Sequence, residues 1–101
     1  MKIIERLSER IEEEISDARY YAEWSLECRD EYPELSKALY TLSAQELEHM
    51  TVLHDHVVAI IKRYREEKGE PPASMLAVYD YLHKKQIAHV EEVKRLQGMY
   101  R

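Results

Sequence analysis

The chain has 101 residues, 35% of them charged, and a formal net charge of −5 at pH 7. This length allows one domain, residues 1–101, with a modest core, so we expect association with a second copy to add stability. Acidic and basic residues are mixed along the chain without a basic stripe, which argues against a nucleic-acid partner. The apolar stretches are short and the N-terminus lacks signal-peptide features, which predicts a cytoplasmic protein without membrane contact.

The residue composition predicts an all-α fold. Only two glycines and three prolines interrupt a chain rich in helix-forming residues. The connection before Pro33 is short, so the first two helices should form an antiparallel hairpin. Gly69 should end the second helix, and Ser74 should cap a third helix that folds back or reaches a neighbour. The expected helices cover about residues 2–30, 34–67 and 74–97.

Two glutamates and one histidine interrupt stripes that should face the interior. Glu14 belongs to a seven-residue apolar repeat of the first helix, whereas Glu12 and Glu13 fall outside it and are predicted to be solvated. Glu46 and His49 lie near the middle of the stripe in the second helix. That stripe recurs every three or four residues and contains Leu35, Leu39, Leu42, Glu46, His49, Leu53, His56 and Ile60.

These three side chains should meet at one level of the hairpin. Glu46 and His49 are three residues apart and share a helical face. Glu14 and His49 are equally far from the turn near residue 32, so a rise of ~1.5 Å per residue brings them side by side. No Lys or Arg falls on either stripe within a turn of them, which makes a metal ion the simplest counter-charge for buried carboxylates. Because Cys28 is the single cysteine, the donors are oxygen and nitrogen, which favours iron and allows manganese or zinc.

The order of these motifs resembles the ferritin-like superfamily, and most closely its encapsulated members, in which two-helix subunits pair to build an iron site. The resemblance covers about residues 10–60 and includes Tyr21, seven residues after Glu14, and the run Gln45-Glu46-Leu47-Glu48-His49. It implies that Glu14, Glu46 and His49 are both metal ligands and catalytic residues of a ferroxidase, with Tyr21 near the iron.

A ferritin-like di-iron site uses four glutamates and two histidines, which is twice the set found in this chain. A two-fold axis through the site would complete it. We therefore predict a homodimer or higher homo-oligomer in which two hairpins form a four-helix bundle. The bundle would bind two irons at the interface and oxidise Fe(II) with dioxygen or peroxide. Two alternatives stay open: a static metal-binding homo-oligomer without redox turnover, and a metal-free helical adaptor.

Several residues are secondary candidates or depart from the family pattern. Tyr20 stands where the family often has Trp. Ser16 and Thr41 stand where the family pattern has accessory metal-binding side chains, which leaves only Glu13 of that set, so we expect no separate iron-entry site. The tail, residues 98–101, lacks the linker and apolar tag of encapsulated cargo, so the sequence does not support encapsulation. Among the secondary candidates, Tyr21 could donate a hydrogen bond or an electron, and Asp17 could orient a histidine. His56 could bind a separate ion or lie at an interface. His89 would reach the site if the third helix packed over it, but it is more simply an interface residue.

Overall fold

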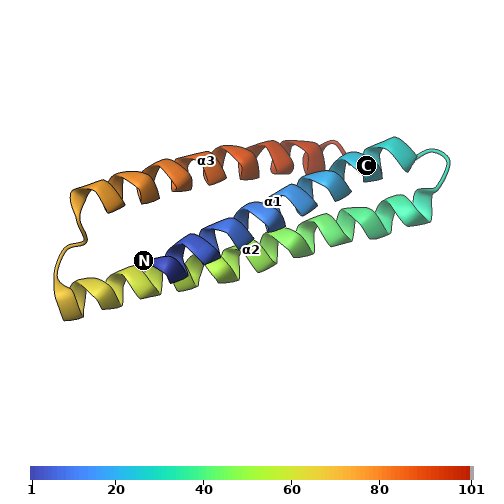
Figure 1. Cartoon of the computed structure of the whole chain (residues 1–101). Helices are drawn as coiled ribbons and strands as arrows, with labels where there is room; N and C mark the ends of the chain where they lie inside the picture. The colour runs from blue at the N-terminus through green and yellow to red at the C-terminus, as the bar shows by residue number, and fades with distance from the viewer. Residues whose placement is uncertain (101) are drawn as a thin grey trace.

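The computed structural model describes residues 1–100, which contain three helices and no strand, so the all-α prediction is confirmed (Figure 1). Each helix begins and ends within two residues of its predicted position. The molecule is a rod with extents of 56 × 18 × 18 Å. None of the helices in the described part has an apolar stretch long enough for a bilayer crossing. The helices are α1, Lys2–Cys28; α2, Pro33–Lys68; and α3, Ala73–Gly98.

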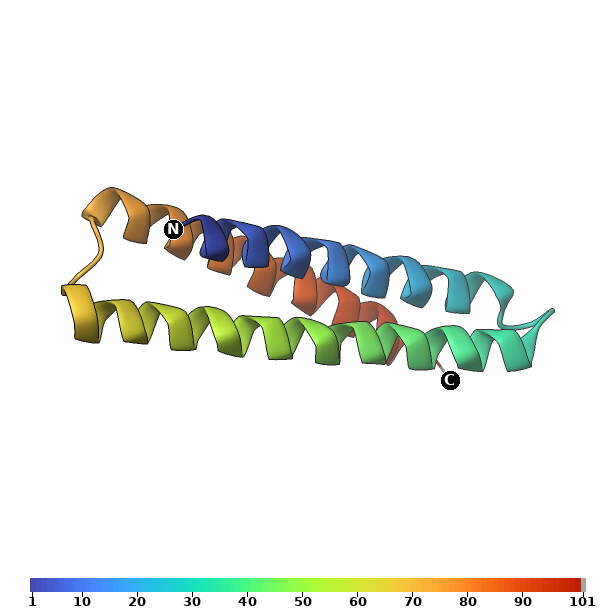
Figure 2. The ribbon, with the colours of Figure 1, turned by 60° about the horizontal axis from the view of Figure 1, so that its bottom comes forward.

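α1 and α2 form the expected antiparallel hairpin, and α3 runs in the same direction as α1 (Figure 2). Gly69 ends α2 as predicted: its φ of 81° lies in the left-handed region that favours glycine, and its N–H donates to the Arg65 carbonyl at 3.0 Å. The prediction for Ser74 is wrong. α3 already begins at Ala73, after Pro72, and no side chain caps it.

The core lies where α1 meets α2 and α3. α3 packs mainly against α1 and closes one side of the hairpin. One side of α3 faces inward, with Gln86, Val93 and Leu96 buried. The central apolar cluster consists of buried Ile11, Ile15, Ala18 and Val93, against which Leu47, Met50, Leu53, Val57 and Val90 pack.

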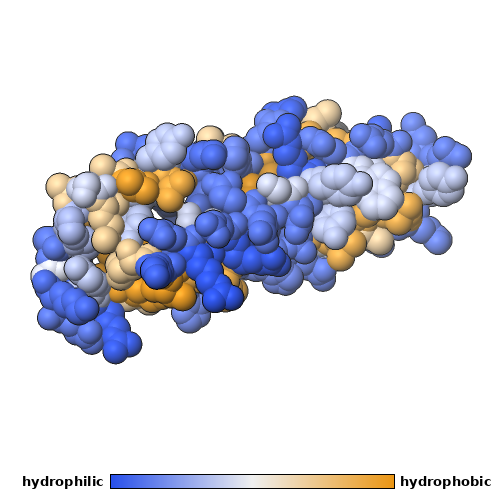
Figure 3. All heavy atoms as spheres, viewed as in Figure 1, coloured by the Kyte–Doolittle hydropathy of each residue, from blue (hydrophilic) through white to orange (hydrophobic). Residues whose placement is uncertain are grey.

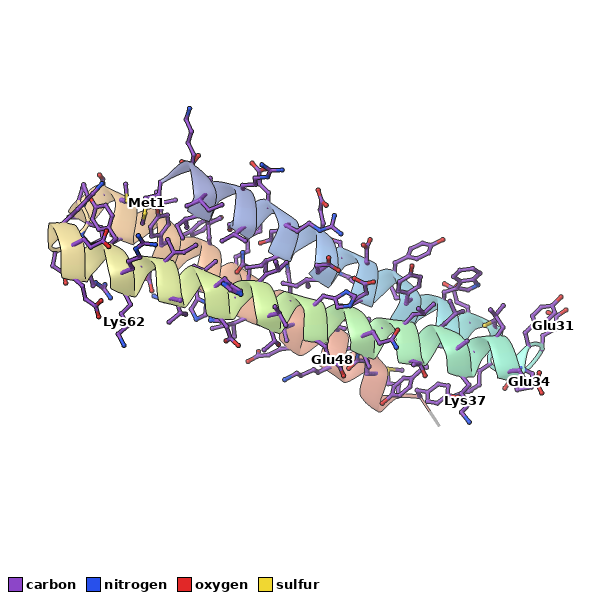
Figure 4. All side chains as sticks on the ribbon, turned by 90° about the horizontal axis from the view of Figure 1, so that it is seen from below. Met1, Glu31, Glu34, Lys37, Glu48 and Lys62 are labelled. Carbon is purple, nitrogen blue, oxygen red and sulfur yellow. The ribbon has the colours of Figure 1, made fainter. Side chains whose placement is uncertain are left out.

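The side of the hairpin opposite α3 is uncovered, as Figure 4 shows with α3 behind the other two helices. The stripe predicted to face the interior from α2 does so only in part: Leu39 is buried and Leu53 packs against the core, but other members are exposed on the open side. Leu35 and Leu42 are 41% and 39% exposed, and His56 is also exposed. The reason is that the core, which α3 closes mainly by packing against α1, lies on the neighbouring face of α2, where Ser43, Leu47 and Met50 lie. We call the uncovered side of α1 and α2 the open face.

A hollow of about 910 Å³ lies between α2 and α3, near the N-terminal ends of α1 and α3. Figure 3 shows hydrophobic residues gathered at this end of the molecule. The largely apolar lining includes Ile4, Val57, Ile61 and Leu82, and none of the three predicted metal ligands belongs to it. This hollow is therefore separate from the predicted metal ligands.

One hydroxyl joins all three helices close to the predicted site. The Ser43 hydroxyl of α2 donates to the Ala18 carbonyl of α1 at 2.6 Å and accepts from the Gln97 amide of α3 at 2.9 Å. Ser43 is fully buried, and its small side chain lets α1 and α2 approach closely. Ala18 is one turn after Glu14, and Ser43 is one turn before Glu46, so this junction fixes the helix register beside both glutamates.

Replacing Ser43 with valine should destabilise the fold. The variant leaves the Gln97 amide without its acceptor and adds bulk at a close helix contact, so we expect the free energy of unfolding to fall by about 1–3 kcal/mol. Urea denaturation followed by circular dichroism measures this. Ser16→Val is the matched control, because Ser16 is exposed on α1. An equal loss of stability in both variants would show that helix propensity, and not the junction, explains the effect.

Candidate metal centre

Glu14 of α1 meets Glu46 and His49 of α2, as the spacing predicted. Each residue offers one donor atom, and these atoms lie within 4.8 Å of one another. His49 Nδ1 is 3.7 Å from Oε2 of Glu14 and 3.7 Å from Oε2 of Glu46. Two donors that each bind an ion at ~2.1 Å are at most ~4.2 Å apart, so both of these donor pairs are close enough to share one ion. The structure therefore contains a carboxylate and imidazole group that could hold a metal.

Burial changes across this group from one side to the other. The side chain of Glu14 is 7% exposed, that of Glu46 is 18% exposed and that of His49 is 59% exposed. Glu14 therefore lies on the buried side of the group, between α1 and α2, while His49 lies on its solvent-exposed side, on the open face. An ion or a second protein copy can reach the group from this side without passing α3.

One carboxylate oxygen in the group has no hydrogen-bond partner. Oε2 of Glu14 is fully buried and accepts no hydrogen bond within the described part of the chain. Leaving a buried acceptor unsatisfied costs about 1–3 kcal/mol, and more if it is charged. This oxygen is also the one nearest His49. The residues therefore fit a metal ion, because an ion bound here would satisfy the orphan oxygen.

No Lys or Arg lies on either stripe within a turn of these glutamates, as predicted, but a basic side chain reaches one of them from outside the stripe. Arg10 lies one turn before Glu14 and donates to Glu14 Oε1 from Nε at 3.1 Å, with Nη2 at 2.9 Å from the same oxygen. The hydrogen bond and the charge of Glu14 raise the pKa of Arg10 above its usual value, so the guanidinium stays charged. Its backbone position is off the apolar stripe, but its long side chain reaches the carboxylate. One of the two negative charges at the site therefore already has a counter-charge.

The donor group of Glu14, Glu46 and His49 includes none of the residues Tyr21, Asp17 and His56. Tyr21 is half-buried, with its ring edge-on to Tyr20 at 6.2 Å between centroids. Asp17 and His56 are exposed. Within the described residues, neither Tyr21 nor Asp17 hydrogen-bonds to Glu14 or to a histidine. The single chain therefore shows no hydrogen bond that would support the roles predicted for Tyr21 and Asp17.

His89 of α3 contacts Glu12, a residue that the sequence pattern predicted to be solvated. Its Nδ1 is 3.3 Å from Oε2 of Glu12, and Oε1 of Glu12 is buried without a partner. The prediction that Glu12 is simply solvated is therefore wrong, while Glu13 is exposed as expected. The interface role preferred for His89 fits this contact. A signal was present in the spacing of Ser8 and Glu12, four residues apart, since Ser8 accepts from Gln86 of α3.

Comparison with protein-family models, with curated proteins and with solved structures gives no match for this chain. The assignment of the site therefore depends on its own geometry and chemistry.

Proposed function

We propose that this protein is a ferritin-like metalloprotein that binds Fe(II) at Glu14, Glu46 and His49 and oxidises it at a site shared by two copies. The observation that carries this proposal is the buried, unpartnered Oε2 of Glu14, which faces an imidazole nitrogen beside a second carboxylate. A polar layer that only fixed helix register would pair this oxygen with a donor. A metal ion satisfies it together with the other two donors.

Charge also favours a cation. Glu14 and Glu46 contribute two negative charges, and the Arg10 guanidinium contributes one positive charge at hydrogen-bond distance. A neutral His49 adds a lone pair and no charge. The group therefore retains one net negative charge in a partly buried place, which a divalent cation would neutralise.

The donor types support iron and its oxidation. Carboxylates and imidazole, without thiolate, suit Fe(II), and the glutamates stabilise the ferric product better than neutral ligands would. Two Fe(II) ions each lose one electron, and one dioxygen accepts both electrons with two protons to give hydrogen peroxide. If hydrogen peroxide is the oxidant, the same two electrons and two protons convert it to two waters.

The open face supports a second copy of the chain as the partner. Helical spacing from Glu14 and Glu46 places apolar side chains on this face on both sides of the donor group, and two-fold pairing would double the three donors to the six of a di-iron site. Four of these apolar residues are more than a third exposed in the single chain: Ile3, Trp24, Leu35 and Leu42.

Metal content and iron oxidation test this proposal together. Protein expressed with added iron and purified without a metal-affinity tag should contain about one iron per chain by elemental analysis. After Fe(II) and oxygen are added to the apo-protein, stopped-flow absorbance should show a ferric signal that grows over many equivalents. A bound metal without that signal would mean a static metal site, and metal content far below one ion per chain would favour the adaptor.

A further inference from the structure

Arg10 bridges the metal group and a neighbouring surface carboxylate. Its Nη2 lies 2.9 Å from Oε1 of Glu14, and its Nη1 lies 2.6 Å from Oε2 of Glu13. The side chain of Arg10 is 55% exposed and that of Glu13 is 62% exposed. The guanidinium therefore approaches the site from solvent and holds a second acceptor outside it.

An ion at the site and the guanidinium of Arg10 compete for the same carboxylate. The orphan Oε2 of Glu14 faces His49, while Oε1 of the same group accepts from Arg10. A divalent cation on Glu14 would therefore lie close to a fixed positive charge, and like charges at this range oppose each other. Using both oxygens of Glu14 for metal would further require Arg10 to leave.

We propose that Arg10 is a displaceable counter-cation that sets the affinity of the metal site, an inference that rests on the function proposed above. Before an ion binds, Arg10 neutralises and orients Glu14. When an ion binds, the guanidinium leaves Glu14 and stays on Glu13. The guanidinium can turn toward solvent without a rearrangement of the core, because the side chains of Arg10 and Glu13 are more than half exposed and the long side chain of Arg10 provides the needed freedom.

A fixed supporting role for Arg10 makes the opposite prediction. Carboxylates that bind metals are commonly held by hydrogen bonds from neighbouring groups, and removing such a group weakens metal binding about 10- to 100-fold. If Arg10 only orients Glu14, its loss weakens binding. If Arg10 competes with the ion, its loss strengthens binding, so the sign of the change separates the two roles.

Cobalt(II) is a suitable probe, because it is stable in air and its affinity can be measured by competition with a chelating dye. We expect Arg10→Gln to bind Co(II) at least about tenfold more tightly than the wild type. Arg10→Lys keeps the positive charge and should stay within about threefold of the wild type. Arg19→Gln is the matched control, because Arg19 pairs with Glu23 on α1 at the same i, i+4 spacing; its affinity should not change.

Each outcome of this experiment decides something. Tighter binding by Arg10→Gln alone, or binding by that variant when the wild type binds none, supports displacement. If the wild type binds Co(II) and Arg10→Gln binds it equally or more weakly, the inference is overturned and the proposed function stands. If Arg10→Lys binds as tightly as Arg10→Gln, the forked hydrogen bonds and not the charge control affinity, and the inference fails. No Co(II) binding by either the wild type or Arg10→Gln would overturn both.

Discussion

Replacing His49 with alanine is expected to abolish iron(II) oxidation while leaving the helices intact, and Glu46→Ala should do the same. Each change removes one of three donors that lie within 4.8 Å of one another. Loss of a group that merely supports a ligand weakens metal binding about 10- to 100-fold, so loss of a ligand itself should cost at least about 100-fold. Stopped-flow absorbance after mixing apo-protein with Fe(II) and oxygen measures the rate, and circular dichroism measures helix content.

Two variants on α2 serve as controls, one for the loss of an exposed glutamate and one for the loss of an exposed histidine. Glu48, labelled in Figure 4, is an exposed glutamate two residues from Glu46. His56 is an exposed histidine two turns beyond His49. Glu48→Ala and His56→Ala should both retain oxidation. Oxidation that survives in His49→Ala and in Glu46→Ala would remove these residues from the mechanism.

Replacing Leu42 with aspartate is expected to prevent pairing of two chains and so to leave each metal site incomplete. Leu42 lies on the open face, one turn before Glu46, and is 39% exposed. A charge at a position that pairing desolvates is strongly unfavourable. We expect the wild type with Fe(II) under anaerobic conditions to sediment as a dimer or larger species. The variant should remain a monomer with at least about tenfold lower metal affinity.

Val78→Asp is the control for this experiment, because Val78 is an exposed apolar residue on α3, away from the open face. This variant should pair as the wild type does. A wild type that binds iron and stays monomeric, or a dimer that persists in Leu42→Asp, would show that the open face is not where two copies meet.

The position of Glu14, Glu46 and His49 along the hairpin could be predicted, because only the helix ends and the length of the turn determine it. Gly69 and the prolines mark the helix ends, and a short turn before Pro33 makes α1 and α2 antiparallel neighbours. Once the hairpin is fixed, equal distance from the turn places Glu14 beside His49, whatever the rest of the fold does. Spacing alone therefore predicted that Glu14, Glu46 and His49 come together.

Two features could not be predicted from periodicity, for different physical reasons. Arg10 was missed because helical periodicity places a backbone position, whereas a guanidinium on a long flexible side chain can reach the adjacent stripe. Glu12 was missed because its burial depends on which face of the hairpin α3 covers. An amphipathic pattern shows that a face is buried but does not identify the helix that buries it.

The hydroxyl of Ser43 also bears on the alignment of the three donors, although Ser43 does not belong to the donor group. Sliding α1 past α2 by a single residue would move Glu14 ~1.5 Å relative to His49, so that their donor atoms would no longer be placed to bind one ion together. The bond from Ser43 to the Ala18 carbonyl opposes such sliding one turn away from the donors. The serine thus holds the donors of the two helices at one level, and under the proposed function its loss would weaken metal binding even where the helices survive.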